Sequence, residues 1–162
     1  MRKMLFSEYQ LSRLMLGTAQ FGMPYGIANI TGRPSYETVR DILACAYEGG
    51  VNCLDTAASY GESEEIIGKA LAELGIADRI IVITKVCHMK NQYLSRQGAD
   101  NVVLKSVTRS LKRLRLDALP FCIFHNEYNF RYMDSLIKLK DKGLVRHVGV
   151  SVSTQLISKM HP

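Results

Sequence analysis

The chain has 162 residues, of which 47% are hydrophobic, which suits one ordinary domain with a sizeable core. Its formal net charge of +6 is compatible with anionic partners, but no zinc-finger spacing or RNA-binding signature supports nucleic acid. The four cysteines have neither the spacing nor the density of a disulfide scaffold, which predicts reduced thiols in a cytoplasmic protein. No signal peptide and no run of 18 apolar residues is present, so no membrane association is expected.

Apolar segments typical of strands alternate with amphipathic helical patterns along the chain. The strands are expected at residues 14–17, 51–54, 80–84, 121–124 and 145–150. The helices are expected to begin near Ser35, Ser63, Asp100, Arg131 and Thr154, and the first three of these residues are expected to be N-caps. Glycines that can end a helix are Gly49, Gly50, Gly75 and Gly143. This alternation favours a parallel sheet whose strands are connected by helices.

Much of the positive charge lies on one predicted helix, which follows a longer polar loop at residues 86–98. Its basic residues are Lys105, Arg109, Lys112, Arg113 and Arg115. Its apolar residues recur at helical spacing, at Val103, Val107, Leu111 and Leu114. A solvated outer face of an amphipathic helix explains this pattern better than a nucleic-acid surface does.

Two architectures fit the alternation, a doubly wound sheet and a barrel. The sequence contains no G-x-G and no G-K-[ST], the phosphate-binding signals expected of nucleotide-binding doubly wound folds. A barrel is therefore preferred, although a closed (β/α)8 barrel usually needs about 200 to 250 residues or more. We predict an α/β fold that is a partial TIM barrel, with about five parallel strands and four to five helices. Residues 1–162 are expected to form this one unit, with no second domain.

Four chemically active side chains follow or end predicted strands, namely Asp55, Tyr60, Lys85 and His125. Each of them alone is better explained as a cap, a half-buried ring or a solvated side chain. Together, the carboxylate, phenol, ammonium and imidazole would meet at one rim of a parallel sheet, where barrel enzymes carry their active sites. An ammonium group beside a phenol favours loss of the phenolic proton. The set therefore predicts a proton-transfer site.

Five segments in chain order resemble motifs of the aldo/keto reductase family. They are L-G-T-A-Q-F-G at 16–22, L-D-T-A-A-S-Y-G-E-S-E at 54–64, I-T-K at 83–85, F-H at 124–125 and V-R-H-V-G-V-S at 145–151. The resemblance covers nearly the whole chain and implies an NADP-dependent oxidoreductase that reduces an aldehyde or ketone to an alcohol. On this basis residues 1–162 correspond to the N-terminal portion of such a barrel.

The resemblance also implies a role for each site residue. Tyr60 is the general acid that protonates the carbonyl oxygen of a small-molecule substrate, and Lys85 assists it. Asp55 holds Lys85 as its counter-ion, and His125 orients the carbonyl as a neutral imidazole.

The cofactor NADP (NADPH) would contact Gly17, Thr18, Asp55 and Ser151. Val152 stands where the family commonly has asparagine, which removes one expected contact to the nicotinamide carboxamide. No metal site is expected, because the neighbouring Cys87 and His88 are too few ligands.

Two hypotheses besides the reductase remain open, a non-catalytic partial barrel and a Schiff-base enzyme. Because the later strands of the family barrel are absent, residues 1–162 alone are expected to have little or no reductase activity and to self-associate. The chain would then be a truncated enzyme or a non-catalytic partial barrel that pairs with itself or another chain. A Schiff-base enzyme that uses Lys85 is a further, weaker alternative.

Overall fold

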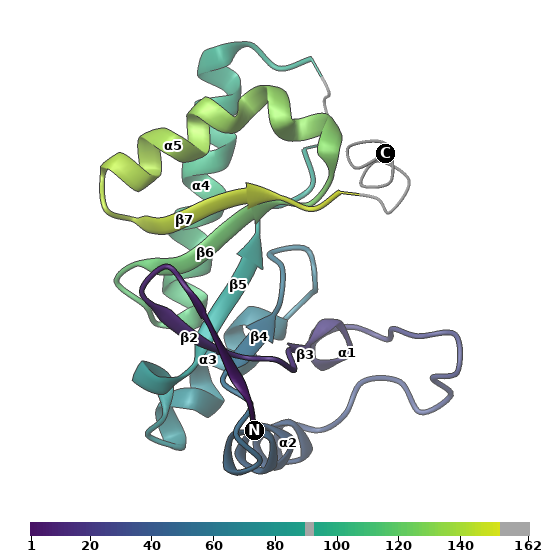
Figure 1. Cartoon of the computed structure of the whole chain (residues 1–162). Helices are drawn as coiled ribbons and strands as arrows, with labels where there is room; N and C mark the ends of the chain where they lie inside the picture. The colour runs from purple at the N-terminus through teal and green to yellow at the C-terminus, as the bar shows by residue number, and fades with distance from the viewer. Residues whose placement is uncertain (90–92, 153–162) are drawn as a thin grey trace, which may run out of the picture.

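The computed structural model describes residues 1–89 and 93–152, and its larger sheet contains five parallel strands. They are β3 (Leu16–Gly17), β4 (Cys53–Asp55), β5 (Ile81–Lys85), β6 (Leu119–Phe124) and β7 (Val145–Val150). Their order in the sheet is the order of the sequence (Figure 1), so each strand lies beside the next strand of the chain. The prediction of a parallel α/β fold with the strand order of a partial barrel is confirmed.

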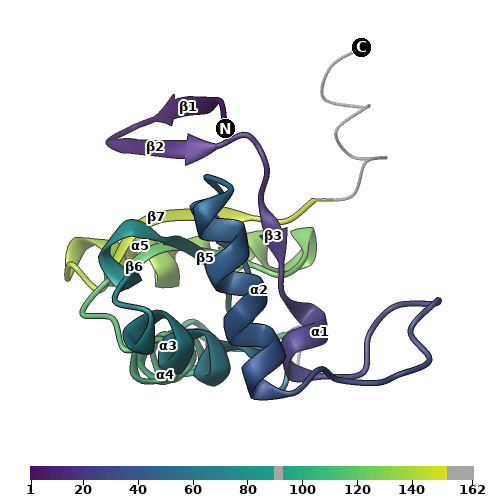
Figure 2. The ribbon, with the colours of Figure 1, turned by 90° about the horizontal axis from the view of Figure 1, so that it is seen from below.

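The main helices lie together on one face of this sheet (Figure 2). The helices are α1 (Ala19–Gly22), α2 (Tyr36–Glu48), α3 (Ser63–Glu73), α4 (Arg96–Leu114) and α5 (Met133–Asp141). Two 3-10 helices, η1 (Ala77–Arg79) and η2 (Glu127–Tyr132), precede β5 and α5. The core between sheet and helices is fully buried at Val39, Leu54, Ile67, Val103 and Leu136. The helix expected from Thr154 lies outside the described residues.

The ends of α2 follow the local chemistry of the sequence. The Ser35 hydroxyl accepts a hydrogen bond from the Thr38 backbone N–H at 3.2 Å, which makes Ser35 the N-cap. Gly50 ends the helix with φ at 87°, a left-handed conformation that glycine adopts without the steric cost of a Cβ atom.

The start of α4 differs from its prediction at Asp100. The helix begins earlier, at Arg96, because the Ser95 hydroxyl caps it by accepting from the Gly98 N–H at 3.1 Å. Asp100 lies in the first turns of the helix and binds the Lys138 ammonium at 2.6 Å and the Ser135 hydroxyl at 2.7 Å. Its carboxylate therefore joins α4 to α5 rather than capping α4. The predicted apolar face is confirmed, since Val103 and Val107 are buried while Lys105 and Arg109 are exposed.

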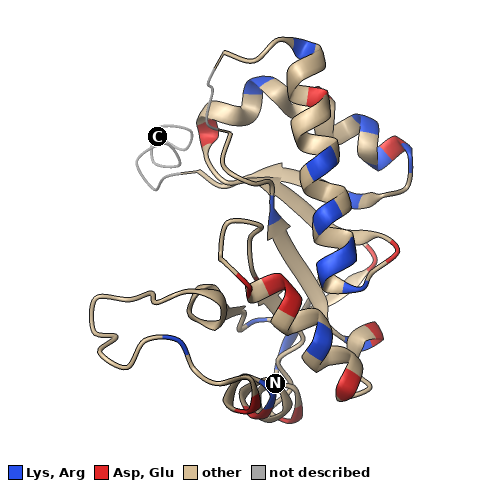
Figure 3. Ribbon diagram, turned by 180° about the vertical axis from the view of Figure 1, so that it is seen from behind, with Lys and Arg blue, Asp and Glu red and all other residues tan. Residues whose placement is uncertain are grey.

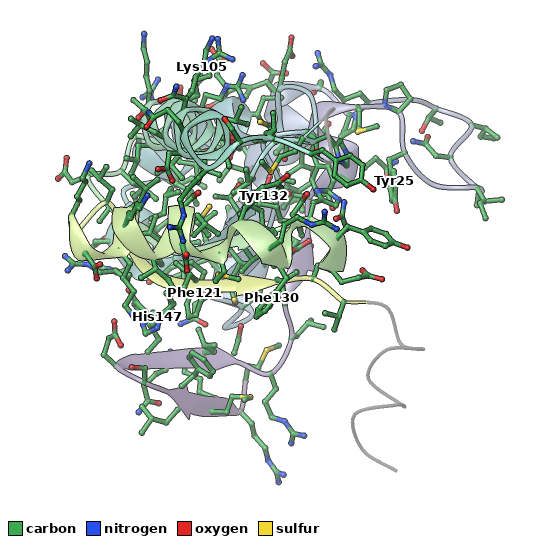
Figure 4. All side chains as sticks on the ribbon, turned by 90° about the horizontal axis from the view of Figure 1, so that it is seen from above. Tyr25, Lys105, Phe121, Phe130, Tyr132 and His147 are labelled. Carbon is green, nitrogen blue, oxygen red and sulfur yellow. The ribbon has the colours of Figure 1, made fainter. Side chains whose placement is uncertain are left out.

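An N-terminal hairpin that the sequence analysis did not predict covers the face of the sheet opposite the helices (Figure 2). It consists of β1 (Lys3–Phe6) and β2 (Tyr9–Ser12), paired antiparallel. Two of its aromatic rings, on Phe6 and Tyr9, lie 5.6 and 5.5 Å from the ring of Phe121. Phe121 and the stacked ring of His147 point toward the hairpin in Figure 4. The hairpin thus packs against the inner face of β6 and β7.

A buried carboxylate joins α3 to the sheet and to α4. Glu64 is 1% exposed, and it accepts hydrogen bonds from the Thr84 hydroxyl at 2.6 Å and from the Arg113 guanidinium at 3.2 Å. Burying a charge is tolerated only when such partners replace water. The Glu64 cluster therefore fixes how α3 and α4 sit on β5.

Replacing Glu64 by alanine is expected to lower the free energy of unfolding by about 2 kcal/mol, because Thr84 and Arg113 lose their shared acceptor. The exposed neighbour Glu65 provides the control, and Glu65→Ala should cost less than about 1 kcal/mol. Urea unfolding of the two variants measures the difference. Equal effects of the two substitutions would show that the buried cluster adds no stability.

Within the part of the chain that the structure describes, no helix has both the length and the hydropathy required to cross a membrane.

Candidate active site

The four side chains singled out in the sequence lie at the carboxyl ends of the parallel strands. Asp55 ends β4, Lys85 ends β5, His125 directly follows β6, and Tyr60 lies in the loop between β4 and α3. In the sheet register Asp55 is opposite Ile83, which lies two residues before Lys85 at the end of β5. Because the strands are parallel, these ends share one rim, and the structure brings all four side chains to it.

Lys85 is the centre of the cluster. Its ammonium nitrogen donates to Asp55 Oδ1 at 2.7 Å and to the Thr56 carbonyl at 2.9 Å, and it lies 3.5 Å from the Tyr60 hydroxyl. The contact with Asp55 is the shortest, as expected for a charge-assisted hydrogen bond. Lys85 is only 6% exposed, so this charge depends on protein partners rather than on water.

His125 lies on the other side of Tyr60. The two rings meet edge to face, with their centroids 5.7 Å apart and an interplanar angle of 87°. The Ser59 hydroxyl lies 3.4 Å from His125 Nδ1, and the ring of His88 lies 4.6 Å away. Partial burial lowers the pKa of His125, and the neighbouring His88 and Lys85 lower it further. His125 is therefore held as a neutral imidazole at neutral pH.

This arrangement predicts a pKa of His125 below its ordinary value of 6.5 in an NMR titration of the histidine rings. His88→Ala should move it upward, because one source of the lowering is removed. The folded protein binds this proton less readily than the unfolded chain, so stability should fall as the pH drops through 6.5. A His125 pKa at or above the ordinary value would contradict the prediction.

Tight backbone contacts position the loop that carries Tyr60. A Cβ atom on Gly22 would lie 1.8 Å from the Tyr60 carbonyl oxygen, and one on Gly61 would lie 2.2 Å from the Gly22 carbonyl oxygen. Gly61 also has φ at 56°, in the left-handed region. Glycine is required at both positions, so that α1 can support the Tyr60 loop directly.

The predicted cofactor residues differ in how they face the rim. Thr18 is fully buried, and its hydroxyl donates to the Asp55 carbonyl at 2.8 Å. Gly17 is exposed, and no atom lies within 4 Å of where its Cβ would be. Ser151 is half-buried at the end of β7, where its N–H donates to the Phe124 carbonyl at 2.8 Å.

A hollow at the rim is lined by Gly17 together with Gln20, Tyr25, Asp55 and Tyr60. Gln20, Tyr25 and Ser59 were not assigned to the site from the sequence, and His88 was considered only as a metal ligand and rejected. Ser59 and His88 both contact His125. Ser59 lies within the D-T-A-A-S-Y segment, so that motif carried a signal for it. His88 had no such signal, because it follows the strand end by three residues.

Ser63 is placed differently from its prediction as a helix cap. It is the first residue of α3, where Glu62 is the N-cap. Its hydroxyl donates to the Thr18 carbonyl at 2.9 Å and lies 3.1 Å from the Thr56 hydroxyl. Ser63 thus joins the loops after β3 and β4 beneath the rim. Among the described residues, no group of three histidine, cysteine or carboxylate side chains could hold a metal ion.

Parallel β/α units that deliver polar side chains to the carboxyl ends of their strands define a protein of the α/β-barrel class. Residues 13–162 match the family model of the Aldo/keto reductase family, so the chain belongs to this family.

Similar proteins are found both by sequence and by structure. The chain is 32% identical over 155 residues to the aldo-keto reductase YhdN of Bacillus subtilis, covering 88% of this chain and 44% of that protein. It is 29% identical over 155 residues to D-arabinose 1-dehydrogenase of Saccharomyces cerevisiae, again covering 44% of that protein. The chain thus spans about half the length of these relatives.

The solved structure of PA4992 from Pseudomonas aeruginosa superposes with a TM-score of 0.73 at 30% identity, covering 90% of this chain and 57% of that one. The aldo-keto reductase AKR11C1 from Bacillus halodurans, in its holo form, gives a TM-score of 0.71 at 25% identity, and the match covers 96% of this chain and 51% of that one.

Proposed function

We propose that this chain carries the proton-transfer site of an NADPH-dependent reductase that converts a small aldehyde or ketone to an alcohol. The observation that supports this most directly is the position of the Lys85 ammonium, 2.7 Å from Asp55 Oδ1 and 3.5 Å from the Tyr60 hydroxyl. Reduction of a carbonyl needs a proton donor beside the oxygen that gains negative charge, and a phenol supported by an ammonium group provides one.

In this proposal Tyr60 donates its hydroxyl proton to the substrate oxygen. The charge of Lys85 stabilises the phenolate that remains, and Asp55 holds Lys85 in place. His125, as a neutral imidazole, donates a hydrogen bond that orients the carbonyl. Ser59 fixes the ring, since its hydroxyl lies 3.4 Å from His125 Nδ1.

The rim suits the nicotinamide end of the cofactor, which supplies the hydride when bound. Gly17 leaves open space beside the Asp55 and Tyr60 side chains, and all three line one hollow. We propose that Gly17 and Asp55 contact the cofactor there and that Ser151 contacts it from the end of β7. Thr18 contributes by its hydrogen bond to the Asp55 backbone, because its own hydroxyl is buried.

The test of this proposal uses a closed barrel that contains this chain. The oxidation of NADPH in the presence of a generic aldehyde is monitored by absorbance. Turnover that requires both NADPH and the aldehyde supports the proposal. A covalent adduct trapped at Lys85 by borohydride, or no turnover with any aldehyde, contradicts it.

The geometry argues against a Schiff-base mechanism at Lys85. The ammonium hydrogens are directed to Asp55, to the Thr56 carbonyl and toward Tyr60. A nucleophilic lysine must present a free lone pair to the substrate, and these contacts hold the nitrogen as a donor instead. Borohydride trapping with a carbonyl compound is therefore expected to leave Lys85 unmodified.

We also propose that a polypeptide of residues 1–162 by itself self-associates and reduces carbonyls slowly or not at all. In the described structure β3 and β7 are the edges of the sheet, and the inner-face residues Ile83, Ile123 and Gly149 are only half-buried. Burying such edges and apolar surface is favourable. Light scattering should show a mass above that of one chain, and NADPH titration should show weak binding or none. A monomer that binds NADPH tightly would refute this expectation.

The location we propose is the cytoplasm, since all four cysteines are free thiols in the structure.

A further inference from the structure

A second hollow lies on the helix side of the sheet, behind the proposed active site. Its walls come from α4, through Lys105, Ser106 and Arg109, and from the loops after β4 and β5, through Ala58 and Cys87. Its volume is about 190 Å³. None of these side chains has a role in the proton-transfer mechanism.

Two of the three cations that line the hollow have no ion-pair partner among the described residues. Lys105, Arg109 and Arg113 follow one another at steps of four and so share one face of α4. Blue segments run along this helix in Figure 3, and Lys105 lies on the helix side, away from Phe121 and His147, in Figure 4. Arg113 pairs with the buried Glu64 at 3.2 Å. Within residues 1–89 and 93–152, Lys105 and Arg109 have no ion-pair partner.

Ser106 adds a buried hydrogen-bond donor to the same wall. It is 4% exposed, and its oxygen accepts from the Cys87 N–H at 2.9 Å. The hydroxyl hydrogen of Ser106 has no acceptor among the described side chains and backbone groups. A hydroxyl donor beside two uncompensated cations is suited to an anion with several oxygen acceptors.

We propose that this hollow binds the phosphate group of a small phosphorylated molecule. The two unpaired charges of Lys105 and Arg109 match a phosphate dianion, and a guanidinium group can bind two phosphate oxygens at once. The volume of about 190 Å³ is below the ~300 Å³ from which pockets for whole drug-sized ligands begin, so the phosphate enters and the rest of the molecule stays outside. The small volume and the lack of aromatic lining residues favour such a ligand over a nucleic acid, which needs an extended basic groove with aromatic side chains.

The position of this phosphate site relates it to the catalytic rim. The Ala58 N–H donates to the Lys85 carbonyl at 3.1 Å, and Cys87 follows Lys85 by two residues. A bound phosphate therefore lies against the two segments that hold Tyr60 and Lys85. Binding at this site does not depend on the proposed reductase function and is measured without it.

The test is an NMR titration of a closed barrel that contains this chain with inorganic phosphate, with sodium chloride at equal ionic strength as the reference. We expect saturable shifts of the Ala58, Cys87 and Ser106 amide signals with phosphate only. Lys105→Gln combined with Arg109→Gln should weaken binding about tenfold or more, because both unpaired cations are lost. Lys105→Arg combined with Arg109→Lys, which keeps both charges, should retain most of the affinity.

Lys112→Gln combined with Lys140→Gln is the matched control, since it removes two positive charges from exposed helix positions outside the hollow. This control should change the affinity by less than about twofold. Equal weakening in the two double variants, or shifts that do not saturate, would overturn the proposal. Tighter binding of a DNA duplex that displaces phosphate from the same amide signals would also overturn it, in favour of a nucleic-acid surface.

Discussion

Tyr60→Phe is expected to lower carbonyl reduction by about 10²- to 10⁴-fold in a closed barrel that contains this chain, because the substitution removes a positioned proton donor. The ring itself is kept, so its edge-to-face contact with His125, at 5.7 Å between centroids, should persist. NADPH affinity should change little, since the hydroxyl is the only group removed. Steady-state kinetics with a generic aldehyde, together with NADPH fluorescence titration, measure both quantities.

Ser59→Ala provides a graded comparison for Tyr60→Phe. It removes the hydroxyl that lies 3.4 Å from His125 Nδ1 and leaves the Tyr60 donor in place. The loss of activity should therefore be smaller than in Tyr60→Phe. Turnover of the Tyr60→Phe variant near that of the unmodified enzyme would rule out Tyr60 as the general acid.

The sequence could predict those features of the fold that depend on local chemistry. The Ser35 cap and the glycines at 50, 75 and 143, which all have positive φ in the structure, mark helix ends through backbone geometry alone. The alternation of strands and helices fits both a doubly wound sheet and a barrel, and these differ in strand order. The sequential order was therefore predicted only after the missing phosphate-binding signals had excluded the doubly wound sheet.

The features that the sequence could not predict depend on distant contacts. The hairpin β1–β2 turns at Ser7 and Glu8, which are not typical hairpin-turn residues. Its support comes from Asn52, far along the chain, whose side chain accepts from the Ser12 N–H at 2.7 Å. Similarly, Asp100 resembled a cap, but its carboxylate binds Lys138 on another helix.

The same distinction applies to the candidate site. Asp55, Tyr60, Lys85 and His125 were found because parallel strands bring their carboxyl ends to one rim. The contact between His88 and His125, with centroids 4.6 Å apart, depends on the path of the loop after β5. Spacing along the chain carries no information about that path.

Lys85→Met is expected to be about as damaging to carbonyl reduction as Tyr60→Phe, and it should also destabilise the rim. Without the ammonium group, the phenolate left by proton donation has no positive charge beside it. Asp55 would lose its 2.7 Å partner and keep a half-buried, unpaired carboxylate. The free energy of unfolding should therefore fall, by about 1 to 3 kcal/mol, in urea denaturation at neutral pH.

The double variant Lys85→Met with Asp55→Asn separates these two effects. Removing the Asp55 charge should restore much of the lost stability, since no unpaired carboxylate remains, but it should leave the activity low. If activity returned together with stability, the role of Lys85 would be to neutralise Asp55 rather than to assist Tyr60. If Lys85→Met alone kept the activity of the unmodified enzyme, Lys85 would have no part in proton transfer, although it lies 3.5 Å from the Tyr60 hydroxyl.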